Sequence, residues 1–385
     1  MIKLGLVTAF SGHFGVSGQE ALRGAYLALA ECDYRVTGNP VKLVTRTTDG
    51  TAGSAINAAR ELLDHEGCDL IIGPLSRDEG IGLRELAKIR HDRVFINGAS
   101  PSQSIINPAP NFLTFCGSCA QWMAGMGRYA YRNRGWRQVA VIGDKTPDFC
   151  TQMGSFNLEF TRMGGNISEM IWCEAGTDNY APYINRIPNH VDAVLCLLNG
   201  PDFIKLSQQL RLLKGHIPMI TGPAVADPSV LHFATEEADY LDGVLVASPI
   251  VDDNPDHDWV RFVDRYRAAY PHDLYSPSAV ACHYYTATTA ALVGLKAVEC
   301  DLSEDRRSLK QALNNLTFQA PQGPVYLDDQ QTAIINNYIG EIRVTVDGTL
   351  YTDLLHKVTG VNATLGLPRA EYLNMGDFNL GQIPA

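Results

Sequence analysis

The sequence predicts an α/β protein with two doubly wound parallel-sheet lobes. Short apolar runs alternate with helical patterns from Ile2 onward, and a second series of the same kind begins at Ala120. Regular alternation of this kind is typical of a parallel sheet with helices on both faces. The chain has 385 residues, whereas a single core rarely grows beyond about 250–300 residues, so two domains are expected.

The composition is that of a folded, acidic protein. Hydrophobic residues make up 45% of the chain and charged residues 19%, with 31 Lys and Arg against 42 Asp and Glu and a net charge of −11. This balance argues against nucleic acid or an anionic membrane as a partner. No apolar run approaches the roughly 18 residues of a membrane span. A strand begins directly after Met1 without a signal peptide, which predicts either a cytosolic protein or an exported one whose signal is missing from this sequence.

The first series is expected to form the core of the first lobe. A glycine-rich loop at 11–15 follows its first strand, and Ser17 with Glu20 has the Ser-x-x-Glu spacing of a capping box, which predicts a helix start there. The last strand runs into small residues at 97–101, which let a ligand approach the backbone. The predicted strands of this series are 2–8, 41–47, 68–72 and 94–96.

The turn after the third strand is the strongest candidate for a ligand loop. Gly73-Pro74 ends an apolar run, and Ser76 and Arg77 stand just before a helical pattern. In an open α/β sheet, ligands sit in the loops at the carboxyl ends of the strands. Ser76 offers a hydroxyl, Arg77 a guanidinium, and the helix start its unpaired N–H groups. The alternative is an ordinary turn in which Ser76 only caps the helix.

The second series and the tail complete the predicted architecture. Asp347-Gly348 is a hairpin turn signal near the end of the chain. The predicted helices are 120–134, 151–163, a short one near Tyr180, 202–213, 259–270, 278–299 and 303–315. The predicted strands are 139–142, 167–172, 193–198, 218–220 and 244–246, with further short strands after Pro321.

The order of several short motifs resembles a known family. They are Gly18-Gln19-Glu20, the loops at 72–76 and 96–100, Asp144-Lys145 followed by Phe149, Thr221-Gly222-Pro223, the stretch 321–325, and 338–341. Together they resemble the type I periplasmic solute-binding proteins. Within these, the resemblance is to the leucine/isoleucine/valine-binding (branched-chain amino acid ABC transporter substrate-binding) family and its amide-binding relatives. It covers essentially the whole chain.

This resemblance implies a hinged, two-lobed receptor with the periplasmic binding protein-like I fold. An N-terminal lobe of residues 1–118 plus 250–328 and a C-terminal lobe of 119–249 plus 329–385 would be joined by a three-stranded hinge near 116–121, 247–251 and 328–335. Hinge bending would close both lobes around a small molecule in the cleft. The implied partner is an ABC permease in the membrane, or a regulatory protein. A monomer or weak dimer in the periplasm, without cofactor or metal, is expected, and a cytoplasmic location is the alternative.

The resemblance also assigns ligand contacts by position. They are Phe14, Ser76, Arg77, Ala99, Ser100, Trp122, Phe149, Asn199, Gly200 and Ala224. Core packing remains the alternative for the three aromatic residues, and Arg77 could be a solvated residue at a helix start. Amino-acid binders of the family carry a carboxylate where this chain has Ala224. A buried ammonium without an acidic partner is costly, so a carboxylate- or carbonyl-bearing molecule with an apolar or aromatic body, such as an aromatic acid or an amino-acid-like compound, is favoured.

Three functions follow from these observations. The first is the solute receptor of an ABC importer, and the second is a cytosolic amide-sensor-type regulator with the same fold. The third is a thiol–disulfide oxidoreductase, because Cys116 and Cys119 have Cys-x-x-Cys spacing at a strand–helix junction. A hinge disulfide or two inert thiols would explain the same pair. The sequence contains no hydrolase, metalloprotease or phosphate-binding loop motif, so no catalytic residues are predicted.

Overall fold

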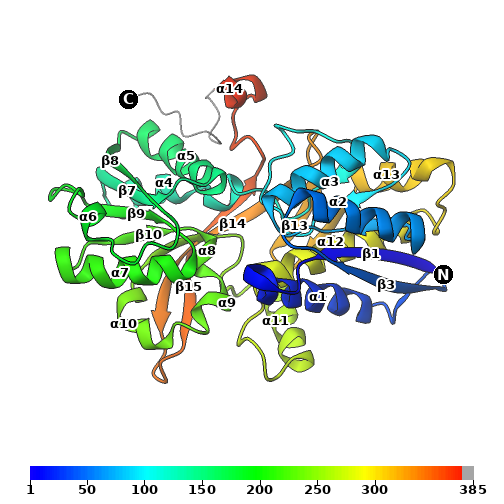
Figure 1. Ribbon diagram of the computed structural model, residues 1–385, viewed down its shortest axis with the longest axis horizontal. Helices are drawn as coiled ribbons and strands as arrows, with labels where there is room; N and C mark the ends of the chain where they lie inside the picture. The colour runs from blue at the N-terminus through cyan, green and yellow to red at the C-terminus, as the bar shows by residue number, and fades with distance from the viewer. Residues whose placement is uncertain (375–385) are drawn as a thin grey trace. The chain divides into compact units, whose positions relative to one another are not determined.

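The computed structural model describes residues 1–374, and the chain divides into two compact units (Figure 1). Unit 1 contains Met1–Ser118 and Asp256–Ile335, and unit 2 contains Cys119–Pro255 and the residues from Asn336 onward. The chain therefore passes between the units three times. Each unit is built on a mostly parallel sheet covered by helices, which confirms the predicted fold class.

The sheet of unit 1 is centred on β1. The strand order is β2-β3-β1-β4-β5-β6, and every pairing from β3 to β6 is parallel. Residues on both faces of β1 and β4 are buried, as expected when helices cover both sides of a parallel sheet. The strands are β1 (Ile2–Thr8), β2 (Arg35–Val36), β3 (Asn39–Thr47), β4 (Leu70–Ile72), β5 (Phe95–Ile96) and β6 (Phe112–Leu113). An antiparallel pair, β12 (Thr317–Ala320) and β13 (Gly323–Leu327), belongs to the same unit.

The helices of unit 1 come from both of its chain segments. A core cluster that includes Val7, Leu62, Ile71, Leu83 and Phe95 joins the sheet to α2 and α3. The main helices are α1 (Gly15–Ala30), α2 (Ala52–Arg60), α3 (Arg77–Ile89), α11 (His257–Ala269), α12 (Ala279–Ala297) and α13 (Arg307–Asn314). Hence residues far apart in the sequence share one core.

The predicted capping box at Ser17 and Glu20 is wrong. A 3-10 turn, η1 (Gly12–Phe14), runs directly into α1, so the helix begins at Gly15 and Ser17 lies inside its first turn. Glu20 is fully buried and accepts a hydrogen bond of 2.6 Å from the hydroxyl of Tyr266 in α11. Its carboxylate also pairs with Arg23 at 2.6 Å. Glu20 therefore joins α1 to α11 instead of capping α1.

The sheet of unit 2 combines five parallel strands with an antiparallel hairpin. The parallel part runs β8-β7-β9-β10-β11, and the later part of β14 pairs antiparallel with β11. β14 and β15 are joined by the predicted turn at Asp347-Gly348, where Gly348 adopts a φ of 85°. The strands are β7 (Gln138–Asp144), β8 (Asn166–Cys173), β9 (Ala193–Leu197), β10 (Met219–Thr221), β11 (Leu245–Ser248), β14 (Ala333–Val344) and β15 (Leu350–Val361).

Helices cover both faces of this second sheet. Successive residues of β7 alternate between two core clusters: Ile142 joins one with Phe203 of α7, and Val141 joins the other with Phe156 of α5. This alternation is the period-2 pattern of a strand buried on both faces. The helices are α4 (Met126–Arg132), α5 (Pro147–Arg162), α6 (Ala181–Ile184), α7 (Gly200–Lys214), α8 (Pro223–Ala226), α9 (Pro228–Leu231), α10 (Ala238–Leu241) and α14 (Arg369–Asn374).

The helix predicted at 120–134 is interrupted. A 3-10 turn, η3 (Gln121–Met123), precedes α4, and Gly125 between them has a left-handed φ of 91°. The amide of Gly125 donates a hydrogen bond of 2.8 Å to the carboxylate of Glu159 in α5. A glycine tolerates this conformation, and the hydrogen bond to the buried carboxylate of Glu159 stabilises it. The break places Trp122 in η3 and not in a regular helix.

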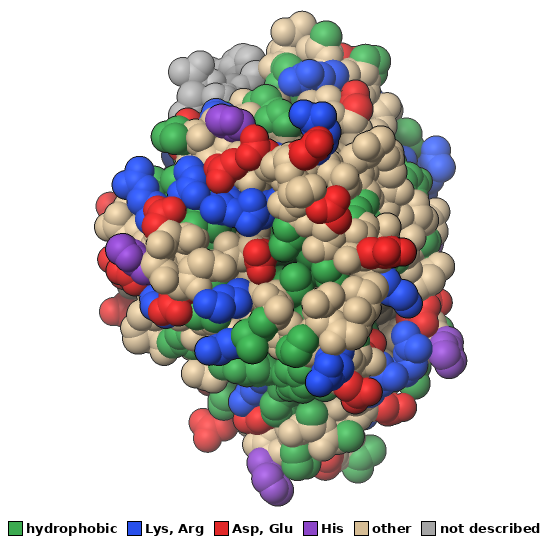
Figure 2. All heavy atoms as spheres, turned by 90° about the vertical axis from the view of Figure 1, so that its right-hand side faces the viewer, with side chains coloured by type: hydrophobic (Ala, Val, Ile, Leu, Met, Phe, Trp, Pro, Cys, Tyr) green, Lys and Arg blue, Asp and Glu red, His purple; other side chains and the backbone are tan. Residues whose placement is uncertain are grey.

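Two features of the described residues bear on the possible partners of the chain. Among residues 1–374, no helix combines the length and apolarity needed to cross a bilayer. In the face shown in Figure 2, basic and acidic side chains are interspersed.

Gly24 provides a test of the packing of α1 on α12. A Cβ atom at Gly24 would lie 2.0 Å from the carbonyl oxygen of Ala281, whereas a Cβ at Gly53 in α2 would meet nothing within 4 Å. We expect Gly24→Ala to lower the free energy of unfolding by about 1–3 kcal/mol through overpacking. Gly53→Ala should be neutral or raise it by up to about 1 kcal/mol. Urea denaturation measures both, and equal effects would contradict this packing.

Candidate functional site

In unit 1, the loops that follow the parallel strands gather at one edge of the sheet. Because β3, β1, β4 and β5 run in the same direction, the residues after Thr47, Thr8, Ile72 and Ile96 all emerge there. This carboxyl edge is where ligands bind in open α/β sheets. Five of the predicted contacts belong to these loops or the helix starts that follow them: Phe14, Ser76, Arg77, Ala99 and Ser100.

Ser76 caps α3 and ties it to a neighbouring loop. Its hydroxyl accepts a hydrogen bond of 3.2 Å from the amide of Glu79, and the Glu79 carboxylate accepts one of 2.9 Å from the Ser76 amide. The Ser76 hydroxyl also donates to the carbonyl of Gly50 at 2.7 Å. The ring of Phe14 packs against the same glycine, since a Cβ there would lie 3.0 Å from Phe14 Cε2. Loops after three strands thus meet at Gly50.

Ala99 and Ser100 hold their loop against the protein. The amide of Ala99 donates to the carbonyl of Pro74 at 2.9 Å, and the amide of Ser100 donates to Asn97 Oδ1 at 3.1 Å. Ser100 is fully buried, and its Oγ lies 2.1 Å from the position of a Cβ on Gly80 of α3. The Ser100 side chain therefore faces α3, and the loop is preorganised by backbone contacts.

Sequence reasoning missed the buried cation behind this loop. Arg84 of α3 is 1% exposed, and its guanidinium donates to the hydroxyls of Ser102 and Ser104 and to the carbonyl of Ser102. Burial lowers the pKa of Arg84 to about 10, and the charge of Arg77 acts in the same direction. The one sequence feature that could have indicated the burial of Arg84 is its position next to Leu83 and near Leu86, both apolar. Arg77 itself is half-buried at the first position of α3.

In unit 2, the corresponding edge brings together Phe149, Asn199, Gly200 and Ala224. Asn199 caps α7: its Oδ1 accepts from the amide of Asp202 at 3.0 Å. Gly200 is buried, and a Cβ there would lie 2.5 Å from Val230. Phe149 is half-buried in the first turn of α5, and Ala224 is half-buried in α8. The tenth residue, Trp122, is 8% exposed in η3 and lies outside these strand-to-helix loops.

Two carboxylates at this edge of unit 2 were not among the predicted contacts. Asp144 ends β7, and burial followed by the charge of Asp202 raises the pKa of Asp144. Asp202, in the first turn of α7, is 4% exposed. Its Oδ2 accepts hydrogen bonds from the amide of Gly176 at 2.8 Å and from Asn199 Nδ2 at 2.9 Å. Asp144 and Asp202 follow different strands, so no local sequence motif could predict that the two carboxylates belong to the same edge.

Comparison with known proteins identifies the family. Residues 1–347 match the family model described as periplasmic binding protein. The chain belongs to this family. The chain is 24% identical over 365 residues to Leu/Ile/Val-binding protein homolog 6 of Brucella abortus, which covers 91% of this chain and 90% of that protein. Members of this family are binding proteins, so the chain is not an enzyme.

Solved structures have the same fold. An ABC transporter substrate-binding protein from Sphaerobacter thermophilus superposes with a TM-score of 0.86 at 24% identity, covering 93% of this chain and 98% of that one. A solute-binding protein of an ABC transporter from Rhodopseudomonas palustris BisB5, in complex with 3,4-dihydroxybenzoic acid, gives a TM-score of 0.83 at 22% identity, with 94% and 98% covered. At these identities the likeness establishes the fold.

In this periplasmic binding protein, Cys116 and Cys119 do not have the environment of a reactive dithiol. Each is buried, and all nine cysteines are thiols. Burial raises the pKa of the Cys116 thiol to about 12, so it is protonated at neutral pH. Reactive thiols need a lowered pKa and access. The prediction of two inert thiols accounts for the pair better than an oxidoreductase.

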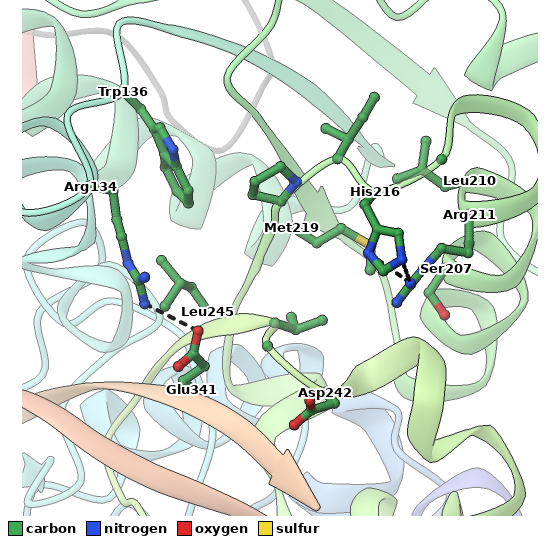
Figure 3. Close-up of a pocket in the computed structure, with 15 residues that line it drawn as sticks. Arg134, Trp136, Ser207, Leu210, Arg211, His216, Met219, Asp242, Leu245 and Glu341 are labelled. Carbon is green, nitrogen blue, oxygen red and sulfur yellow. Dashed lines mark hydrogen bonds and ion pairs between the residues drawn. The ribbon is translucent and has the colours of Figure 1, made fainter.

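A pocket of about 280 Å³ lies at the opposite edge of the unit 2 sheet (Figure 3). It is lined by residues that precede β10 and β11, and Figure 3 shows Arg134 and Trp136 across from Arg211 and His216. Arg134 pairs with Glu341 at 3.2 Å, and Arg211 contacts the ring of His216. Because it lies at the amino edge, this pocket is separate from the predicted ligand loops of the binding protein.

The cap at Ser76 gives a stability prediction. Replacing an N-cap serine by alanine costs about 0.5–2 kcal/mol, and Ser76→Ala would also remove the bond to Gly50. We expect the free energy of unfolding to fall by that amount, while Ser76→Thr, which keeps a capping hydroxyl, should lose less. Urea denaturation followed by circular dichroism measures this. An unchanged midpoint for Ser76→Ala would contradict the role of the cap.

The thiols give a second prediction. At pH 8 the native protein should react with iodoacetamide at the half-buried Cys32 and Cys300, and Cys116 and Cys119 should react only after unfolding. Peptide mass spectrometry locates the modified residues. The native protein should not accelerate the reduction of insulin disulfides. Fast native labelling of Cys116 together with such acceleration would restore the oxidoreductase hypothesis.

Proposed function

We propose that this chain is the solute receptor of an ABC importer. It binds a small molecule that carries a carboxylate or carbonyl group on an apolar or aromatic body. The observation that carries this proposal is Arg77 at the first position of α3, on the carboxyl edge of the unit 1 sheet, in a chain that belongs to the periplasmic binding protein family. An ABC permease in the membrane is the proposed partner.

The start of α3 favours an anionic group. The first amides of a helix point toward its N-terminus, where the helix dipole is positive. Arg77 adds a planar guanidinium, which can bind a carboxylate through two parallel hydrogen bonds. Ser76 and its contact with Gly50 fix where the helix begins. We therefore assign the acidic or carbonyl end of the ligand to this loop.

The apolar body is assigned to aromatic residues at the two carboxyl edges. Phe14 of unit 1 and Phe149 of unit 2 are half-buried, so each ring keeps part of its surface for a partner. Aromatic side chains contribute large contact areas and favour offset or edge-to-face ring packing. A ligand held by both units would stabilise a closed form by its differential affinity for that form.

The structural neighbours agree with this ligand class. Related solute-binding proteins from Rhodopseudomonas palustris are in complex with 3,4-dihydroxybenzoic acid, benzoate and 4-hydroxybenzoate. The substrate-binding protein LivJ of Streptococcus pneumoniae is in complex with isoleucine. Ala224 stands where the amino-acid binders resembled by this chain carry a carboxylate, so we favour the aromatic acids.

A cytosolic ligand sensor with the same fold is the second candidate. It is favoured by the chain's count of nine cysteines, because cysteine thiols are kept reduced in the cytosol. We propose the periplasm as the location, in keeping with the family. Fractionation of cells that express the native gene decides between them: release with the periplasmic fraction supports the receptor, and retention in the cytosol supports the sensor.

Ligand screening tests the proposed site. We expect benzoate and its hydroxyl derivatives to raise the melting temperature more than leucine or aliphatic amides, because a ligand that binds only the folded state stabilises it. Arg77→Ala should weaken carboxylate binding roughly 10- to 150-fold in isothermal titration calorimetry, the effect of losing a charge-assisted hydrogen bond.

Arg307→Ala is the matched control. This arginine of α13 lies in the same unit, is 80% exposed and pairs with Glu304. Its removal should leave ligand affinity unchanged. Equal affinities for wild type and Arg77→Ala would remove the loop after β4 from the site, and a preference for leucine would replace the aromatic acids by branched-chain amino acids.

A further inference from the structure

Asp144 is a partly buried carboxylate without a cation. It ends β7 at the carboxyl edge of the unit 2 sheet. Within residues 1–374 it takes part in no ion pair, and the backbone amide of Lys145 is the one neighbour that lowers the pKa of its carboxyl. Removing a charge from water without a partner is unfavourable. The burial of Asp144 therefore needs an explanation beyond its own fold contacts.

A second carboxylate, Asp202, lies in the first turn of α7, which follows β9, and β9 pairs with β7 through Leu197 and Gly143. Only Oδ2 of Asp202 is engaged, by Gly176 and Asn199, and no described residue donates to Oδ1. The nearest lysine along α7, Lys205, forms its ion pair with Asp178 at 2.6 Å and not with Asp202. Two carboxylates that approach without a cation repel each other. The pair is thus the kind of arrangement that a bound cation or hydrogen-bond donor would stabilise.

The hydroxyl of Tyr180 is a second polar group at this edge that lacks a hydrogen-bond partner in the described chain. This residue precedes α6 and is fully buried, and its hydroxyl has no hydrogen-bond partner in the described chain. Burial raises the pKa of Tyr180 well above its ordinary value, and Asp202, Cys173 and Asp144 are the next contributors. Tyr180 follows β8, whose last residue Cys173 pairs with Asp144, and Gly176 in the same connection is bonded to Asp202. Buried hydroxyls are almost always bonded, so an additional partner is expected here.

We propose that Asp144 and Asp202, with the hydroxyl of Tyr180 beside them, form a polar subsite that recognises a hydrogen-bond donor of the ligand. The donor is a phenolic hydroxyl or an amino group. This inference rests on the proposed function, because it names a further polar contact of the ligand proposed there. The acidic group of that ligand binds in unit 1, and the donor lies at its other end.

A purely structural role explains only part of this arrangement. The bonds of Asp202 to Asn199 and Gly176 cap α7 and fix the loop after β8, but they involve neither Asp144 nor Tyr180. A metal ion is also a poor occupant. Among residues 1–374, no group of three His, Cys, Asp or Glu side chains has a metal-binding arrangement, whereas hard cations such as Ca²⁺ take six or more oxygen ligands.

The subsite narrows the ligand class. Benzoate carries an acid but no donor, whereas 4-hydroxybenzoate and 4-aminobenzoate carry both at opposite ends of the ring. 4-Methoxybenzoate has nearly the shape of the hydroxyl compound but can only accept hydrogen bonds. A site built to hydrogen-bond a donor rejects the analogue that lacks it, because its own polar groups are then left unpaired.

The experiment compares these four acids by isothermal titration calorimetry on the wild-type protein, on Asp144→Asn and on Asp178→Asn. The wild type should bind the hydroxyl or the amino compound at least tenfold more tightly than benzoate or 4-methoxybenzoate. Asp144→Asn should abolish that preference, because it removes the negative charge that the ligand's hydrogen-bond donor faces. Asp178 is the control because it is an exposed aspartate of the same unit that pairs only with Lys205 among the described residues, and its replacement should preserve the preference.

The outcomes separate the two proposals. If no aromatic acid binds the wild type, both the proposed ligand class and the subsite fall. If benzoate and 4-methoxybenzoate bind as tightly as the donor compounds, only the subsite falls. The wild-type series decides this without any variant, so a folding defect in Asp144→Asn, detected by circular dichroism, cannot hide the result. A preference that survives in folded Asp144→Asn also overturns the subsite.

Discussion

The hydrogen bond from Ser76 to Gly50 is the contact on which the arrangement of unit 1 depends most. Through its hydroxyl, Ser76 caps α3 and holds the loop after β3, and the ring of Phe14 from the loop after β1 packs on the same glycine. The Ser76 side chain thus helps to hold the loops after three parallel strands together at their common edge. Without this registration, Arg77 and the amides of α3 would not be directed to a fixed place.

Burial of polar groups behind the loops continues this preorganisation. The buried guanidinium of Arg84 donates hydrogen bonds to the hydroxyls of Ser102 and Ser104. These bonds hold the segment after β5 against α3. Hydrogen bonds of a charged donor are stronger than neutral ones, and leaving such a donor unpaired is costly. The loop that contains Ala99 and Ser100 is therefore joined to α3 through Ser102, which contacts both Ser100 and Arg84. Loops held in this way lose little conformational freedom on binding a ligand.

Much of the fold was predictable because it depends on local patterns. The apolar runs of β1, β4, β7 and β9, and the alternation with helices, are visible in the sequence, and so is the hairpin at Asp347-Gly348. Contacts between distant residues were not predictable. Ser17 and Ser76 both begin a Ser-x-x-Glu motif, yet only Ser76 caps a helix, because the turn at 12–14 starts α1 before Ser17, and Glu20 bonds to Tyr266 of α11 instead. Local spacing cannot report such a partner.

The candidate site also combines features that local sequence patterns predict with features that depend on contacts between distant residues. Sequence reasoning located the edge loops through Gly-Pro turns and small residues, and the ligand contacts Ser76, Arg77 and Asn199 that it placed there stay predictions. It could not find Arg84, whose charge is hidden in an apolar helix face, or the approach of Asp144 to Asp202, which come from separate strand–helix units. A capping serine and a ligand-binding serine also share one sequence pattern. The structure resolves the cap, because the two hydrogen bonds of the motif are present.

The proposed function requires that the ligand binds at the carboxyl-edge loops of each sheet. Hydrogen–deuterium exchange with and without saturating 4-hydroxybenzoate tests it most directly, because protection is measured along the whole chain. The account predicts new protection at residues 48–51, 73–80 and 97–100 of unit 1 and at 144–150 and 199–202 of unit 2. Protection limited to one unit, or centred on the amino-edge pocket at 134–136 and 215–219, would contradict it.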